Sequence, residues 1–308
     1  MQTIKKLFDT GSFECFMYDD RKAFFPCRGK FVFADVLADK KADVVIDRIK
    51  LSNNPDKVAF TTDKRNALFV NTSGEGFVYD MTENMQVCKV KTGLELFTGH
   101  LAGCDNGFLF IDWENYNDSL YYMDALNGEK THIDCIDKCR YLFDAGENIL
   151  LFVIDRSKND GGWIKDCARV YSVSKSNPTD IKALDWILPE GDVKNVVRTY
   201  DGEVLIIIQQ VRGHYKEVVY RADIVNHKVQ ELFEADDFIE SDDGYLKAVD
   251  ANIKDGKLYF MTVGNLKIID IDTKQVLFKQ SFKYGADVKR IKDNLIVSTW
   301  EGVFRLDV

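Results

Sequence analysis

The 308-residue chain carries a formal net charge of −9 at pH 7 and contains only four prolines. This negative charge argues against nucleic acid or an anionic membrane as the main partner, because both require a basic surface. An apolar content of 45% is enough for a sizeable core, and 21 Phe, 13 Tyr and 4 Trp are typical of a protein rich in β-strands.

A pair of strands separated by a polar turn recurs along the chain. The copies, in chain order, are residues 31–47, 76–90, 119–135, 168–186, 217–233 and 266–280, and the tail 303–308 begins a seventh. The spacing is roughly 40–50 residues, which is the range of four-stranded propeller blades.

Each of these pairs follows an apolar strand–turn–strand segment. The clearest examples are residues 95–112, 140–154, 193–210, 244–263 and 287–300. Asp-Gly, Asn-Gly and Asp-Asn lie between the apolar runs and favour tight turns, because these residues tolerate positive φ. The runs are almost continuously apolar, as expected for strands covered on both faces. A short helix is expected only within residues 234–243.

The last repeat lacks its final strand. The tail "VFRLDV" (303–308) stops where the preceding repeat continues with "TKQVLFK" (273–279), and residues 3–9 read "TIKKLFD". We therefore predict that residues 2–9 complete the last blade, formed by 286–308, and close one propeller domain spanning 1–308. A ring of six or eight blades would follow if the weak unit near 49–72 were miscounted, and two stacked β-sandwiches are the other alternative.

Four strands end in an apolar residue followed by Asp, where a WD repeat has Trp-Asp. These are Tyr79-Asp80, Met123-Asp124, Ile269-Asp270 and Leu306-Asp307. The phasing resembles the WD40/YVTN-like propeller superfamily over essentially the whole chain, which implies an all-β, seven-bladed β-propeller of four-stranded antiparallel blades. No blade has Trp-Asp, and Gly99-His100 is the one Gly-His pair in the usual place of that family. The resemblance therefore implies the fold and no particular function.

The same resemblance implies that b–c turns and the links between blades share one face, where a to d denote the strands from the centre outwards. The longest connections of that face are 113–118, 155–166, 211–215 and 234–243. Insertions on one face often mark a binding surface. Its residues of the types that anchor interfaces are Trp113, Tyr116, Arg156, Trp163, Arg212 and His214. We predict partner binding there, the alternative being that each Trp caps its own blade.

Signatures of catalysis and metal binding are weak. The sequence has no nucleophile elbow, zinc-protease motif, P-loop or dinucleotide-binding loop. His132, Cys135 and Cys139 lack a fourth zinc ligand, so buried thiols are favoured. The loop 155–166 departs from a calcium loop in its glycine positions and has no flanking helices. The acidic run 234–243 could collect a cation or a basic partner, although a solvated link is favoured. No catalytic residue, metal or cofactor is assigned.

Seven cysteines at irregular spacing favour reduced thiols in a cytoplasm. The N-terminus lacks a signal-peptide core, and the longest apolar runs are too short to span a bilayer. Had a leader been removed, Asn71 and Asn117 would open glycosylation sequons. We predict a cytoplasmic, monomeric scaffold that binds a protein partner. The alternatives are an enzyme with a site at the channel mouth (a metal-assisted hydrolase, lactonase or lyase) and a purely structural, oligomer-forming domain.

Overall fold

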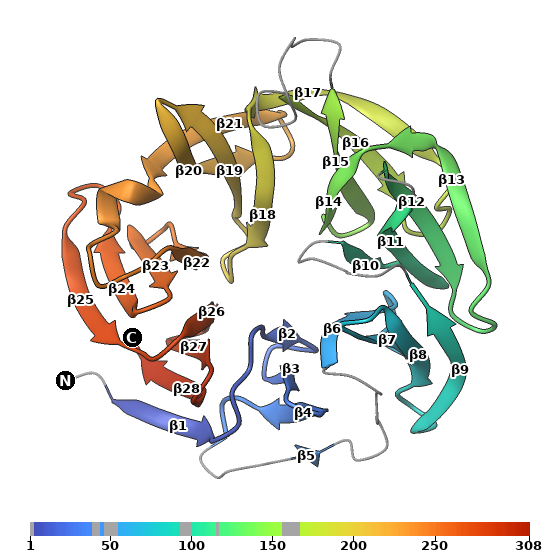
Figure 1. Ribbon diagram of the computed structural model, residues 1–308, viewed down its shortest axis with the longest axis horizontal. Coiled ribbons are helices and arrows are strands. Elements are labelled where there is room, and N and C mark those ends of the chain that lie inside the picture. Colours follow the sequence, from blue (N-terminus) through green and yellow to red (C-terminus); the bar gives the residue numbers. More distant parts are fainter. Residues whose placement is uncertain (1–2, 39–43, 46–54, 93–99, 115–116, 156–166) are drawn as a thin grey trace.

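The chain folds into a closed ring of seven antiparallel sheets, each with four strands (Figure 1). The structure is a computed structural model, and it describes residues 3–38, 44–45, 55–92, 100–114, 117–155 and 167–308. In six sheets the strand nearest the central opening is followed outwards by the next three strands of the sequence, and in the seventh the N-terminal strand takes the outermost place, so each sheet is one blade. The predicted seven-bladed propeller is confirmed.

Blades one to four follow one another along the chain. Blade one contains β2 (Phe16–Met17), β3 (Lys22–Cys27), β4 (Lys30–Asp35) and β5 (Val44–Val45), and blade two contains β6 (Pro55–Phe60), β7 (Asn66–Asn71), β8 (Glu75–Asp80) and β9 (Met85–Lys91). Blade three contains β10 (Leu101–Gly103), β11 (Gly107–Glu114), β12 (Asn117–Asp124) and β13 (Lys130–Asp137), and blade four contains β14 (Cys139–Asp144), β15 (Asn148–Asp155), β16 (Cys167–Ser174) and β17 (Ile181–Glu190).

Blades five to seven complete the ring. Blade five contains β18 (Asp192–Arg198), β19 (Val204–Arg212), β20 (His214–Asp223) and β21 (Lys228–Glu234), and the short 3-10 helix η2 (Ala235–Phe238) follows it. Blade six contains β22 (Leu246–Asn252), β23 (Lys257–Thr262), β24 (Asn265–Asp270) and β25 (Val276–Ser281), and blade seven contains β26 (Gly285–Ile291), β27 (Asn294–Thr299), β28 (Gly302–Asp307) and β1 (Ile4–Phe8). The helix lies inside the segment 234–243 where the sequence predicts one.

The N-terminal strand closes the ring as predicted. Strand β1 pairs antiparallel with β28, with Ile4 opposite Leu306 and Lys6 opposite Phe304. Phe8 at the end of β1 is buried, and its ring meets that of Phe25 in blade one edge to face at 5.1 Å. Backbone pairing therefore joins the beginning of the chain to its end, Phe8 packs this strand against blade one, and Figure 1 shows β1 beside β28.

Seven apolar clusters lie in the described core, and each joins two neighbouring blades. In one of them Phe152 and Trp186 of blade four pack with Ile206 of blade five. The cluster across the closure contains Phe8 from β1 and Ile296 from β27 together with residues of blade one. Because every cluster needs side chains from two blades, the stability of a blade depends on its neighbours.

The Asp residues that end the third strands build the turns after them. The carboxylate of Asp80 accepts a hydrogen bond from the backbone N–H of Thr82 at 2.8 Å, and that of Asp124 accepts one from Leu126 at 2.8 Å. Asp270 likewise accepts the N–H of Thr273 at 2.7 Å. The repeated Asp is thus a side-chain cap of a tight turn, which explains its presence without a His–Asp network.

Candidate functional site

The blade topology divides the connections between two faces. The b–c turns and the links between blades share one face, which we call the linker face, and the a–b and c–d turns share the opposite face. The innermost strands β2, β6, β10, β14, β18, β22 and β26 surround the central opening (Figure 1).

The interaction residues predicted from the sequence belong to the linker face of blades three to five. Tyr116, Arg156 and Trp163 lie outside the described residues, and the side chains of Trp113 and Arg212 are not described either. The side chain of His214 is exposed, and its Nε2 lies 3.2 Å from a carboxylate oxygen of Asp236. Partner binding by this sector therefore stays a prediction.

Two of the connections predicted as loops are extended hairpins instead. In blade three, Trp113 pairs with Asp118 and Glu114 with Asn117. In blade five, Arg212 pairs with His214 across Gly213, whose φ of 81° is favourable for glycine. The backbone pairing thus continues through polar residues at these tips, so polarity alone was a misleading signal for a loop.

Exposed aromatic side chains gather on the linker face. Six are strongly exposed in the described part of the chain, and these are Phe13, Tyr200, Tyr215, Tyr245, Tyr284 and Trp300. Five of them lie in links or b–c turns of the linker face. Tyr200 alone lies on the opposite face, where the Arg290 guanidinium covers its ring at 5.6 Å. Exposed apolar surface of this kind marks an interaction site when it is contiguous.

Three of these side chains form one contiguous group, which we call the aromatic ridge: Phe13, Tyr284 and Trp300. The Trp300 ring meets Phe13 edge to face at 5.5 Å and Tyr284 at 5.4 Å between centroids. Phe13 comes from the link before blade one, Tyr284 from the link before blade seven and Trp300 from the b–c turn of blade seven. The ridge therefore exists only because the ring closes between these blades.

Backbone contacts hold the ridge in place. The N–H of Trp300 donates to the carbonyl of Tyr284 at 3.1 Å, and the N–H of Ser12 donates to the carbonyl of Thr299 at 2.9 Å. Gly11 lies so close to the Trp300 backbone that a Cβ there would be 2.1 Å from its carbonyl oxygen. The ridge is thus built on loops that are fixed to one another, a favourable basis for binding because little order has to be gained.

A recess of about 680 Å³ lies beside the ridge, and we call it the ridge recess. Its lining consists of Asp9, Thr10, Gly11, Phe13, Pro26, Cys27, Arg28, Pro55 and Trp300. The walls are mostly apolar, and the volume falls in the range of pockets that hold small molecules or a few side chains.

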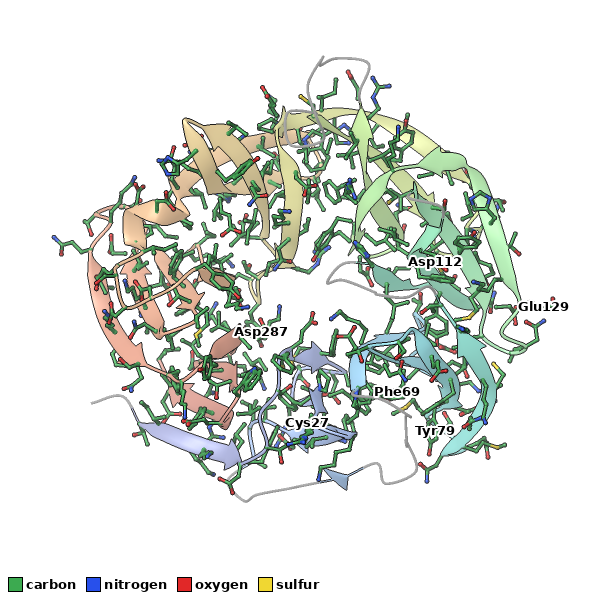
Figure 2. The ribbon with its side chains drawn as sticks, viewed as in Figure 1. Cys27, Phe69, Tyr79, Asp112, Glu129 and Asp287 are labelled. Atoms are coloured by element: carbon green, nitrogen blue, oxygen red, sulfur yellow. The ribbon has the colours of Figure 1, made fainter. Side chains whose placement is uncertain are left out.

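The central channel is the second candidate site, with a cavity of about 640 Å³. Two of the carboxylates that line it have lysine partners: Glu14 lies 3.0 Å from Lys57, and Asp287 lies 3.9 Å from Lys289. Figure 2 shows Asp287 at the inner edge of the ring, and the other oxygen of its carboxylate accepts the N–H of Cys15 at 3.0 Å.

Burial governs the titration of the channel groups. It raises the pKa of Asp287, against which the Lys289 charge acts, and it raises the pKa of the Glu14 carboxyl in spite of Lys57. Burial also raises the pKa of the Cys15 thiol well above its ordinary value, and the Asp287 charge adds to this. Burial and the charge of Asp287 therefore both favour the thiol form of Cys15 over the thiolate.

The carboxylates of the acidic link after blade five all have basic neighbours within the protein, namely four lysines and His214. The contacts of its six carboxylates are Glu234 with Lys216, Asp236 with His214, Asp237 with Lys274, Glu240 with Lys279, Asp242 with Lys279 and Asp243 with Lys267. Glu240, Asp242 and Asp243 come close enough to share a metal ion, but the ammonium groups of Lys267 and Lys279 already lie among them. The link is therefore an ion-paired segment in which Asp243 is buried, while Asp236, Asp237, Glu240 and Asp242 stay exposed to solvent as the sequence favours.

The His–Cys group considered for zinc is divided by the fold. His132 lies in the outermost strand of blade three, against the ring of Tyr121 at 4.9 Å. Cys139 lies in the innermost strand of blade four and belongs to an apolar cluster, and the side chain of Cys135 lies outside the described residues. Cys139 is therefore a core side chain, as the sequence favours.

Comparison with known proteins gives the fold. No protein-family model and no curated protein matches the sequence. Hydrazine synthase from Kuenenia stuttgartiensis is similar at 13% identity with a TM-score of 0.64, over 99% of this chain and 97% of that chain. Sqt1 of Saccharomyces cerevisiae is similar at 10% identity with a TM-score of 0.59, over 98% of this chain and 83% of that chain. The β-propeller domain of Cps50 (Swd1) from Myceliophteria thermophila is similar at 9% identity with a TM-score of 0.65, over 99% of this chain and 100% of that chain.

The chain has a WD40-like propeller fold. Its expected resemblance to that superfamily is confirmed at the level of the fold, since identities of 9–13% carry no information on activity or partners. Among the described residues, no helix is long and apolar enough to cross a membrane.

Proposed function

We propose that the protein is an interaction module that binds a partner protein through its linker face. The observation that carries the proposal is the aromatic ridge, in which Phe13 and Trp300 are each 60% exposed and Tyr284 is 52% exposed. Large aromatic side chains dominate the binding energy of protein interfaces because they bury much area with few rotatable bonds. Five of the six strongly exposed aromatic residues in the described segments lie on this face.

The test compares partners captured by three forms of the immobilised protein from an extract of its native host. These are the wild type, a Phe13→Ala/Trp300→Ala variant, and Tyr200→Ala as the matched control on the opposite face. We expect the same partners on the wild type and the control, and a loss of at least tenfold on the ridge variant. Equal capture by all three forms would contradict the choice of face. A fourth form, Trp163→Ala/Arg212→Ala, tests whether the sector predicted from the sequence takes part.

A channel-mouth enzyme is the second candidate. The buried acids Glu14, Asp250 and Asp287 at the channel favour it. Pairing of Glu14 with Lys57 and of Asp287 with Lys289 acts against it. Elemental analysis of the purified protein separates the two candidates. Stoichiometric calcium or zinc that disappears in Glu14→Gln/Asp287→Asn would favour the enzyme.

A further inference from the structure

We propose that the aromatic ridge and the ridge recess bind a short linear segment of the partner in which an apolar side chain stands next to acidic residues. This inference rests on the proposed function and adds the chemistry of the ligand. It is carried by three features: the packing of the rings, the charges around the recess, and the size of the recess.

The ring packing favours an apolar ligand group over a cationic one. A cage for an ammonium group needs open ring faces on several sides of the cation, each within about 6 Å. Here the rings of Phe13 and Trp300 meet edge to face at an interplanar angle of 82°, and the ring of Tyr284 packs against Trp300 at 45°. The rings pack against one another and do not stand apart around an open space for a cation. What remains exposed is a continuous apolar surface, which suits an aromatic or branched side chain.

The charges around the recess leave one cation without a partner. Asp9, which lines the recess, lies 3.1 Å from the ammonium of Lys6, and Glu301 beside Trp300 lies 3.3 Å from that of Lys283. Arg28 also lines the recess and is exposed, and it forms no ion pair within the described part of the chain. A guanidinium binds a carboxylate through two parallel hydrogen bonds. The recess thus complements an acidic group placed within reach of the apolar anchor.

The walls of the recess are rigid enough to select such a segment. Pro26 lies in β3 of blade one and Pro55 in β6 of blade two. Cys27, the last residue of β3, also lines the recess and is buried. The hydroxyl of Ser12 is buried and donates to the carbonyl of Pro26 at 3.1 Å, which fixes the link that carries Phe13 to the wall of the recess. A volume of about 680 Å³ accommodates a few side chains rather than a folded domain.

The experiment measures fluorescence polarisation of three labelled octapeptides titrated with the whole protein up to millimolar concentration. The first carries Phe flanked by two Glu in a Gly/Ser background, the second has Lys in place of both Glu, and the third has Gly in place of Phe. We expect the first to bind at least tenfold more tightly than either of the others. Arg28→Glu should weaken its binding about tenfold and reverse the preference in favour of the Lys peptide, because the charge of the recess is inverted.

Three results would overturn the inference. One is no measurable binding of the acidic peptide, and another is equal binding of the acidic and basic peptides to the wild type. The third is a wild-type dimer that Trp300→Ala converts to a monomer in sedimentation, since the ridge would then contact a second copy of this chain. The capture experiment separates failures: if partners are lost with the ridge but the peptides show no charge preference, only the ligand chemistry is wrong. If capture does not depend on the ridge, the proposed function itself is wrong.

Discussion

Blades six and seven end their second strands with the same turn on the linker face. Thr262, the last residue of β23, donates its hydroxyl to the carbonyl of Asn265 at 3.1 Å. Thr299, the last residue of β27, donates its hydroxyl to the carbonyl of Gly302 at 3.0 Å. Both threonines are completely buried. The two turns therefore share a backbone that is closed by the same side chain.

The residue after each threonine is also fixed in the same way. The N–H of Val263 donates to the carbonyl of Tyr245 at 3.2 Å, and the N–H of Trp300 donates to the carbonyl of Tyr284 at 3.1 Å. The difference lies in the link that precedes each blade. The long link before blade six places its carboxylates around the completely buried Lys267, whereas the short link before blade seven, residues 282–284, leaves its turn uncovered.

The comparison shows that the same turn lies beside an enclosed ion pair in blade six and carries an exposed aromatic side chain in blade seven. In blade six the Lys267 ammonium donates to a carboxylate oxygen of Asp243 at 2.5 Å and to the carbonyl of Phe238 at 2.6 Å, so its charge is enclosed. In blade seven the corresponding surface ends in the exposed Trp300. The long link before blade six uses polar side chains to enclose Lys267, while the short link before blade seven leaves the Trp300 side chain exposed.

The largest expected effect comes from breaking the enclosed ion pair of blade six. Lys267→Met removes the ammonium but leaves the buried carboxylate of Asp243 without its partner, which costs about 3–5 kcal/mol in the free energy of unfolding. Urea denaturation of the two proteins measures the difference. Adding Asp243→Asn to the Lys267→Met variant should restore part of the lost free energy of unfolding, because the buried charge without a partner is then removed.

The matched control is an exposed pair of the same link. Lys274 lies 3.4 Å from Asp237, and both side chains are largely exposed. Lys274→Met should lower the free energy of unfolding by less than about 1 kcal/mol, as is usual for surface pairs. A similar loss in both variants would mean that enclosure of Lys267 is not what distinguishes blade six.

A smaller effect is expected from Gly11→Ala at the base of the aromatic ridge. The new methyl group would overlap the carbonyl oxygen of Trp300, so the link before blade one has to move away from blade seven. Such overpacking costs about 1–3 kcal/mol. The intrinsic fluorescence of Trp300, isolated in a chain whose other tryptophans are replaced by Phe, should shift as its contact with Phe13 is lost. An unchanged spectrum together with unchanged stability would show that the loop is not pinned there.

The stability that the Lys267–Asp243 pair gives to blade six should depend on pH. Burial alone would raise the pKa of Asp243, but hydrogen bonds from Lys267 and the backbone of Glu240 outweigh it and hold that pKa below its ordinary value. A carboxyl whose folded pKa is lowered stabilises the fold above its unfolded pKa of about 4, and this contribution is lost as the pH falls through the folded value. The advantage of the wild type over Lys267→Met/Asp243→Asn should therefore shrink between pH 5 and pH 3. A constant difference would contradict the ionic role of the pair.

Most of the fold could be predicted from local patterns. The apolar runs between the turn residues correspond to the strands of the structure. The strand that is missing after Leu306 is supplied by β1, which has the same apolar pattern as the outermost strands of the other blades. The error concerned the hairpin tips at 113–118 and 211–215. The polar residues in these two segments do not follow the apolar pattern of the strands, so the sequence does not show whether the strands continue.

The site could not be predicted because its parts are distant in the sequence. Phe13 and Trp300 meet only when the ring closes, and a single exposed aromatic residue in a turn looks the same as one that covers its own blade. The acidic link is a similar case, since partners such as Lys216 and Lys267 lie in strands on either side of it and no local pattern connects them. The signal in the sequence that indicates the ridge is the presence of aromatic residues in turns and links of the same face in neighbouring predicted blades.

The smallest effect on stability is expected from Tyr284→Gly, and it decides what the ridge is for. Tyr284 has a φ of 53°, in the left-handed region that costs an L-residue about 1–2 kcal/mol and costs glycine nothing. This gain is offset by the lost contact with Trp300, about 0.5–1.5 kcal/mol, and by the flexibility of glycine in the unfolded chain, about 0.5–1 kcal/mol. The free energy of unfolding should therefore change by less than about 1 kcal/mol, while capture of the partner falls severalfold. A loss of more than about 2 kcal/mol in the free energy of unfolding, with unchanged capture, would mean that the Tyr284 ring only covers blade seven. Blades six and seven would then stabilise the same turn in two different ways, one with an ion pair and one with aromatic packing.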